Sequence, residues 1–164
     1  MNQAEVFSVT LQRNQDFIIK ATDGLAHSES VLQLPGDSNC MNWVLGHVAV
    51  YRDVMLAGIS QTGFLTAAEV SLYTYDSKPV TANSKSSGLE RLLKVLTTTH
   101  DDISTWLDRN SDGMDDATPL DLDMSYGPTV IENFAFLFWH ESNHVGELHA
   151  LRELALVNLG KGWK

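Results

Sequence analysis

Residues 89–110, LERLLKVLTTTHDDISTWLDRN, decide the fold class of this chain. Apolar residues recur every three or four positions along this stretch, at Leu89, Leu93, Leu96, Ile103 and Leu107, and His100 shares their face. This spacing predicts an amphipathic helix from Gly88 to Asn110. No part of the chain shows the sustained two-residue alternation of a half-buried strand, so the sequence indicates an all-α fold.

Three further segments have helical spacing. The first has helical spacing over residues 4–27, with its end expected between residues 24 and 30. Its apolar positions are Val6, Val9, Phe17, Ile18 and Ala21. The second covers 41–56, where Trp43, His47, Val50 and Val54 share a face, and the third runs from Thr129 to Asn158, before Gly160. The sequence therefore predicts a four-helix bundle that forms a single domain over residues 1–164.

Two connections separate these helices. Residues 58–88 are rich in Gly, Ser, Thr and Asn, with room for one short helix at TAAEVSLY, residues 66–73. Residues 111–128 form an acidic loop.

Composition limits the partners of the protein. Lys and Arg number 11 against 21 Asp and Glu, a net charge of −10, which disfavours nucleic acid and anionic lipid. No apolar run is long enough to cross a bilayer, and the first 20 residues do not resemble a signal peptide. The single cysteine, Cys40, cannot form an internal disulfide. We therefore expect a cytoplasmic protein that contacts neither nucleic acid nor membrane.

The stretch WHESNHVGELH, residues 139–149, carries the candidate chemistry. On a helix, His144 lies only about 40° around the axis from His140 and one turn along, so both imidazoles reach one ion. Leu137, Leu148 and Leu151 share that stripe, which turns the pair toward the core. Buried histidines need partners, and either a metal ion or a hydrogen-bond network would supply them. The third ligand must come from another helix: His47 is the natural candidate and His100 the rival.

The same stretch contains H-E-x-x-H over residues 140–144, the zinc-peptidase pattern, in which Glu141 would be the general base. His149 lies about 180° from His140 on an unbroken helix, so it cannot be the third ligand there. Gly146 and His149 each come one residue too early for the longer pattern that turns at its glycine. A zinc metallopeptidase stays an alternative, and a solvated or interhelical charge is the other interpretation of Glu141.

Several neighbouring residues have structural interpretations beside functional ones. Glu147 lies near the histidine stripe, where it would bind a ligand histidine or pair with Arg152. Gly146 suggests close helix packing or ligand approach, and Asn42 suggests a helix cap. Trp43, Phe134, Phe136, Phe138 and Trp139 are expected to be core or interface aromatics.

A calcium-loop half-motif follows the third predicted helix. Asp108, Asn110, Asp112 and Gly113 match its first half, but Pro119 stands where a bidentate glutamate belongs. A turn that ends the helix explains these residues as well as calcium binding does.

Two segments together resemble the DinB-like family of four-helix metalloproteins. They are NWVLGHVA, residues 42–49, and HESNHVGELHALREL, residues 140–154. The resemblance covers nearly the whole chain and implies that His47, His140 and His144 bind a divalent metal ion, zinc or nickel. The 58–88 and 111–128 connections contain no motif of the family.

Three neutral imidazoles leave one coordination position open, where a zinc-type ion lowers the pKa of water to about 7 or takes a thiolate. The resemblance favours the thiol, because relatives include S-transferases that use low-molecular-weight thiols. It implies a transferase or hydrolase acting on an unidentified small molecule, and a homodimer. A non-catalytic, stress-linked metal-binding bundle is the remaining alternative.

Overall fold

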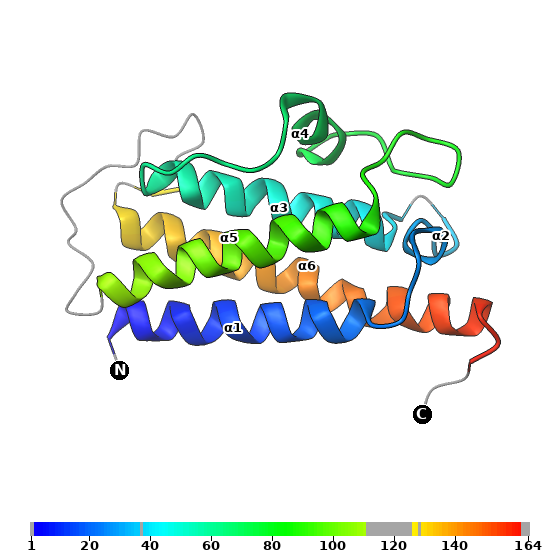
Figure 1. The fold of residues 1–164 in the computed structure, drawn as a ribbon, viewed down its shortest axis with the longest axis horizontal. Helices are drawn as coiled ribbons and strands as arrows, with labels where there is room; N and C mark the ends of the chain where they lie inside the picture. Colours follow the sequence, from blue (N-terminus) through cyan, green and yellow to red (C-terminus); the bar gives the residue numbers. More distant parts are fainter. Residues whose placement is uncertain (1, 37, 111–125, 128, 162–164) are drawn as a thin grey trace.

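A computed structural model describes residues 2–36, 38–110, 126–127 and 129–161 of the chain (Figure 1). The described residues form helices and connections, with no strand among them. The helices are α1 (Gln3–Thr22), α2 (His27–Ser30), α3 (Met41–Gly58), α4 (Ala67–Tyr73), α5 (Leu89–Arg109) and α6 (Val130–Asn158). The all-helical prediction is confirmed, and nearly every predicted helix boundary is correct to within two residues.

The four long helices lie side by side along the molecule (Figure 1). α3 and α1 each pack against both α5 and α6, so α5 and α6 separate α1 from α3. The short α4 packs on α3 from the 58–88 connection. One continuous core of Leu, Val, Ile, Met and aromatic side chains fills the space between the helices. Among the described residues, no helix combines the length and apolar character needed to cross a bilayer.

Local sequence signals explain where the helices start and stop. Thr129 caps α6 by accepting a hydrogen bond from the Glu132 backbone N–H, and Glu132 reaches back to the cap. Thr66 and Glu69 form the same motif at α4, the short helix predicted at residues 66–73. Gly160 has φ +66°, a left-handed backbone conformation that glycine adopts without strain and that ends α6.

The first helix departs from its prediction in two respects. It ends at Thr22, earlier than expected, and His27–Ser30 forms a separate turn of helix. Of its predicted apolar positions, Ile18 and Ala21 are buried, but Val6 and Val9 are about half exposed (46% and 52%). The buried face instead follows Ala4, Phe7, Leu11, Asn14, Gln15, Ile18 and Ala21. Asn14 and Gln15, in the middle of that face, are polar, so the spacing of apolar residues alone does not reveal it.

Asn42 does not cap α3, contrary to the prediction. Cys40 occupies the cap position, and Asn42 lies fully buried in the first turn of the helix. Its side chain donates to the Ser87 carbonyl at 2.9 Å and accepts from the Tyr73 hydroxyl at 2.9 Å. Asn42 therefore ties the last residue of α4 and the connection just before α5 to α3.

Candidate metal centre

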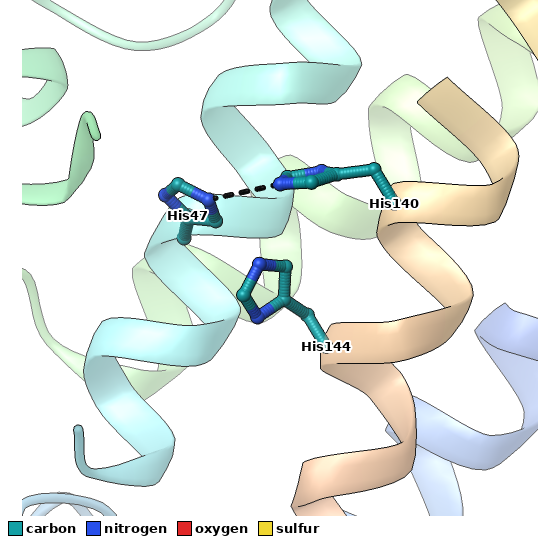
Figure 2. A group of neighbouring side chains, drawn as sticks. All are labelled: His47, His140 and His144. Atoms are coloured by element: carbon teal, nitrogen blue, oxygen red, sulfur yellow. Dashed lines mark hydrogen bonds between the residues drawn. The ribbon is translucent and has the colours of Figure 1, made fainter. Parts of the chain in front are cut away.

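Three imidazoles from two helices converge between α3 and α6. His47 projects from α3, and His140 and His144 project from successive turns of α6 (Figure 2). The Nε2 atoms of His47 and His140 lie 3.3 Å apart. Each of the three rings offers one nitrogen, and these nitrogens all lie within 4.8 Å of one another. The structure thus brings together the three residues that the sequence singled out as ligands.

The side chain of His47 is fixed on both sides. Its Nδ1 lies 2.6 Å from the Tyr73 carbonyl oxygen at the end of α4. A carbonyl only accepts hydrogen bonds, so Nδ1 carries the proton and Nε2 keeps a free lone pair that faces the cluster. The Trp43 ring stacks on the imidazole from one turn earlier in α3, with centroids 4.5 Å apart. His47 is 1% exposed, so this orientation is enclosed by protein.

Burial keeps two of the imidazoles neutral. Removal from water lowers the pKa of His47 to about 4, against the opposing effect of the Tyr73 carbonyl. Burial also lowers the pKa of His140 to about 4, and the neighbouring His144 and His47 lower it further. Neutral imidazole is the form that binds metals. At neutral pH, His47 and His140 can therefore bind a metal ion without first losing a proton.

His144 meets a carboxylate on its outer side. The Glu147 Oε1 atom lies 3.1 Å from Nδ1 of His144, three residues along α6. This contact lacks the alignment of a hydrogen bond, because the buried Nδ1 atoms of both His140 and His144 have no hydrogen-bond partner. Glu147 is half exposed, so it borders the cluster at the protein surface. Of the two interpretations of Glu147, the structure shows the contact with His144.

The donor set and its spacing fit a divalent metal ion. Tetrahedral coordination with metal–nitrogen distances of about 2.0–2.1 Å places ligand nitrogens about 3.3–3.4 Å apart. The 3.3 Å separation of His47 and His140 matches that value. Imidazole suits zinc and nickel, and three such ligands leave a fourth position for an exchangeable group. The described residues place no Cys, Asp or Glu within this cluster.

Glu141 lies elsewhere, in a buried ion pair with Arg52 of α3. Its Oε1 accepts from Nη2 at 2.8 Å and its Oε2 from Nε at 3.1 Å. The sequence prediction placed the histidines at the centre of the buried stripe of α6. The buried residues of this helix instead centre about 90° around the axis from His140, close to the position of Glu141. The histidines occupy the edge that faces α3, and Glu141 forms the interhelical charge that the sequence left as an alternative.

Neither His100, the rival for third ligand, nor His149, which helix geometry had excluded, joins the cluster. His100 is on α5, where its Nδ1 lies 3.0 Å from the Asp101 carboxylate. His149 is more than half exposed and lies 3.8 Å from Glu153 on the outer side of α6. There it lines a surface groove of about 1200 Å³ between the C-terminal halves of α1 and α6. This groove includes none of the three clustered histidines.

Aromatic side chains wall the cluster on the side toward the start of α6. The Tyr51 ring lies 4.2 Å from the His140 ring and 4.8 Å from the His47 ring, between centroids. Phe136 stacks on His140 at 5.9 Å, and Tyr126 stacks on Phe136 at 3.9 Å. Burial raises the pKa of Tyr126, and the Tyr51 hydroxyl raises it further. Of the five aromatics expected in the core or an interface, Trp43 and Phe136 contact the clustered histidines, Phe134 and Phe138 are buried in the core, and Trp139 is 62% exposed.

Sequence reasoning missed Arg52, Tyr51 and Tyr73. Arg52 could have been found, because it is a lone cation on a largely apolar helix and a charge there needs a buried partner. The contribution of Tyr73 is a backbone carbonyl, which has no sequence signature. The calcium prediction falls partly on residues 111–125, outside the described residues. Within them, Asn110 ends α5 and its side chain donates to the Trp106 carbonyl.

An all-helical protein with a three-histidine cluster between two helices is the class that these observations define. The model of the DinB superfamily matches residues 10–148, and the chain therefore belongs to this superfamily. The fold is similar to the crystal structure of a conserved protein from Enterococcus faecalis. The TM-score is 0.67, with 15% sequence identity over 95% of this chain and 98% of that one. No curated protein matches the sequence.

Proposed function

We propose that this chain is a DinB-like metal-dependent enzyme with the four-helix-bundle architecture of that family. His47, His140 and His144 bind one zinc or nickel ion and leave one position open for a thiol or water. The observation that carries the proposal is the 3.3 Å separation of two Nε2 atoms that come from different helices. The neutral state of His47 and His140 supports it, because buried neutral imidazoles are ready to coordinate.

The bound ion would supply a Lewis acid that lowers the pKa of a group at the open position. The protein supplies orientation and shielding. The Tyr73 carbonyl holds the proton of His47 on Nδ1 and so keeps Nε2 available. Trp43 and Tyr51 are both buried and cover the His47 ring, which limits access of water from their sides. Glu147 Oε1 lies 3.1 Å from Nδ1 of His144, where the carboxylate would accept a hydrogen bond from a protonated Nδ1 once the two groups are aligned.

A thiol S-transferase is the reaction class we favour, with hydrolysis as the second. The resemblance to thiol-dependent relatives supports transfer of a low-molecular-weight thiol to a small substrate. A metallopeptidase of the H-E-x-x-H class would need Glu141 as its general base. Both oxygens of that carboxylate are engaged by Arg52, which argues against peptide hydrolysis.

Metal analysis of purified protein tests the site. We expect roughly one divalent ion per chain in the wild type, and a loss of most of it in His144→Ala. His149→Ala is the matched control, because this histidine lies on the same helix outside the cluster. Full metal retention in His144→Ala would contradict the ligand assignment. A wild type that takes up no zinc, nickel or cobalt would leave only a non-catalytic, metal-free protein.

Cobalt substitution tests the open position. Addition of a low-molecular-weight thiol to the Co²⁺ protein should produce a sulfur-to-cobalt charge-transfer band, because a thiolate would enter the vacant position. Unchanged spectra with glutathione, bacillithiol and mercaptoethanol would argue for water at that position and hence for a hydrolase.

Compartment and assembly complete the proposal. Cys40 is buried and unpaired, which is compatible with a reducing cytoplasm. Exposed apolar side chains on α1 and α6, among them Val9 and Val157, support a homodimer. Light scattering on the purified protein measures the assembly directly.

A further inference from the structure

Arg52 joins all four long helices at one point in the core. From α3 it donates two hydrogen bonds to Glu141 of α6, at 2.8 and 3.1 Å. Its Nη1 donates to the Gln15 side chain of α1 at 2.7 Å and to the Leu96 carbonyl of α5 at 2.7 Å. Arg52 is 0% exposed, Glu141 1% and Gln15 4%. We call this group the Arg52 clamp.

The Arg52 clamp is not explained by stability alone. Two charges lose their hydration when they are buried, and their attraction commonly does no more than offset that loss. Apolar residues of similar size usually serve a core equally well. A bidentate arginine–carboxylate pair differs from apolar contacts because it is directional. Its two parallel hydrogen bonds form in only one relative placement of the partners.

The clamp lies next to the histidine cluster in both helices. Glu141 follows His140 directly in α6, and Arg52 comes five residues after His47 in α3. Five residues correspond to about 7.5 Å along a helix. A slip of α3 against α6 by a single residue would move His47 by about 1.5 Å, far more than a metal–nitrogen bond tolerates. The placement that the two hydrogen bonds enforce is the one in which the Nε2 atoms lie 3.3 Å apart.

We propose that the Arg52–Glu141 pair positions the metal centre by fixing the register of α3 against α6, so that Glu141 acts as a positioning residue and not as a general base. This inference rests on the proposed metal binding.

Replacement of the whole pair separates positioning from stability. The variants are Arg52→Met, Glu141→Met and the double variant Arg52→Met/Glu141→Met, each measured for urea unfolding without metal, for zinc affinity by chelator competition, and for its Co²⁺ spectrum. Each single variant leaves a buried charge without its partner and should unfold at much lower urea. The double variant should recover most of that loss. Its zinc affinity should nevertheless fall about 10–100-fold, with an altered Co²⁺ spectrum, because the register is no longer enforced.

Arg152→Met is the matched control. Arg152 also joins two helices, donating from α6 to the Ala21 and Asp23 carbonyls at the end of α1. It lies away from the cluster, so this variant should bind zinc with wild-type affinity. If the double variant also keeps wild-type affinity and the wild-type cobalt spectrum, the clamp is structural only and the inference is overturned.

Conservative variants decide the question if the double variant does not fold. Arg52→Lys keeps the charge but cannot make the bidentate contact. Glu141→Gln keeps the shape and loses the charge. We expect zinc affinity to fall at least about tenfold in Arg52→Lys, and wild-type affinity in both variants would overturn the inference. A wild-type protein that binds no metal would refute the proposed function itself, which is a separate outcome.

Discussion

His47 is the most constrained of the three clustered histidines. Its backbone is in α3, its proton is held by the last residue of α4, and its ring is covered by Trp43. The sequence identified His47, His140 and His144 because helical spacing places each on an inward face. It did not identify the Tyr73 carbonyl, since any residue type offers that atom. The three clustered side chains were thus predictable, and the backbone group that orients one of them was not.

The metal-free protein should lose stability as the pH falls from about 6.5 to about 4. The folded pKa values of His47 and His140 are about 4, whereas an unfolded histidine titrates near 6.5. The unfolded state therefore takes up protons first, and the stabilisation is complete above pH 6.5 and lost by pH 4. We expect a loss of about 2–3 kcal/mol for each histidine. Urea unfolding with a chelator present measures it.

His47→Gln isolates this effect from other pH-dependent contributions to stability. The variant should show a smaller decrease in unfolding free energy over the same pH range. A decrease equal to that of the wild type would show that His47 is protonated in the folded state.

Helical periodicity predicted the long helices well but predicted their inner faces less reliably. The buried face of α1 contains Asn14 and Gln15, and that of α6 contains Glu141. Each of these polar residues has a buried or half-buried partner on another helix, such as Arg52 for Gln15 and Ser142 for Asn14. A search for apolar spacing does not find such positions, because a polar side chain is buried without a large free-energy cost only when a partner hydrogen-bonds to it.

The glycines of α3 and α6 differ in what surrounds them. Gly146 was expected to allow close helix packing or ligand approach, but an added Cβ there would meet no atom within 4 Å, so close packing does not explain this glycine. Gly46 has the packing role instead, because a Cβ at this position would collide with the Tyr73 ring. The 58–88 connection approaches α3 at this point, and Gly46 makes that approach possible.

Alanine at these two glycines should therefore have opposite effects. Gly46→Ala should lower the free energy of unfolding by about 1–3 kcal/mol, because the buried Tyr73 ring must move. Gly146→Ala should raise it by up to about 1 kcal/mol through helix propensity. Urea unfolding of the two variants beside the wild type tests this pair of predictions. A stabilised Gly46→Ala would show that α4 yields without cost.

Across the whole molecule, the expected all-helical class and the family agree with the observed architecture. What the sequence could not supply was the relative rotation and register of α3 and α6. That geometry depends on contacts between residues about 90 positions apart, such as Arg52 with Glu141. The site therefore belongs to the assembled molecule and to no single motif.

Metal should stabilise the whole fold, since the ligands join helices that are distant in sequence. An ion that binds only the folded state contributes about 2.7 kcal/mol at a concentration 100 times its Kd. We expect zinc to raise the thermal midpoint of the wild type and of His149→Ala, and excess EDTA to reverse the increase. His144→Ala should show little increase. Equal increases in all three proteins would place zinc binding elsewhere.

The distance along the chain between His47 and His140 bears on how the protein is made. These residues are 93 positions apart, so at about 5–20 residues per second a ribosome needs roughly 5–20 s to add the second after the first. During that interval the nascent chain carries only one of the three clustered imidazoles, His47. Under the proposed function, capture of a metal ion by the cluster would have to wait until α6 has been synthesised and has packed against α3, so a bound ion would mark completed folding.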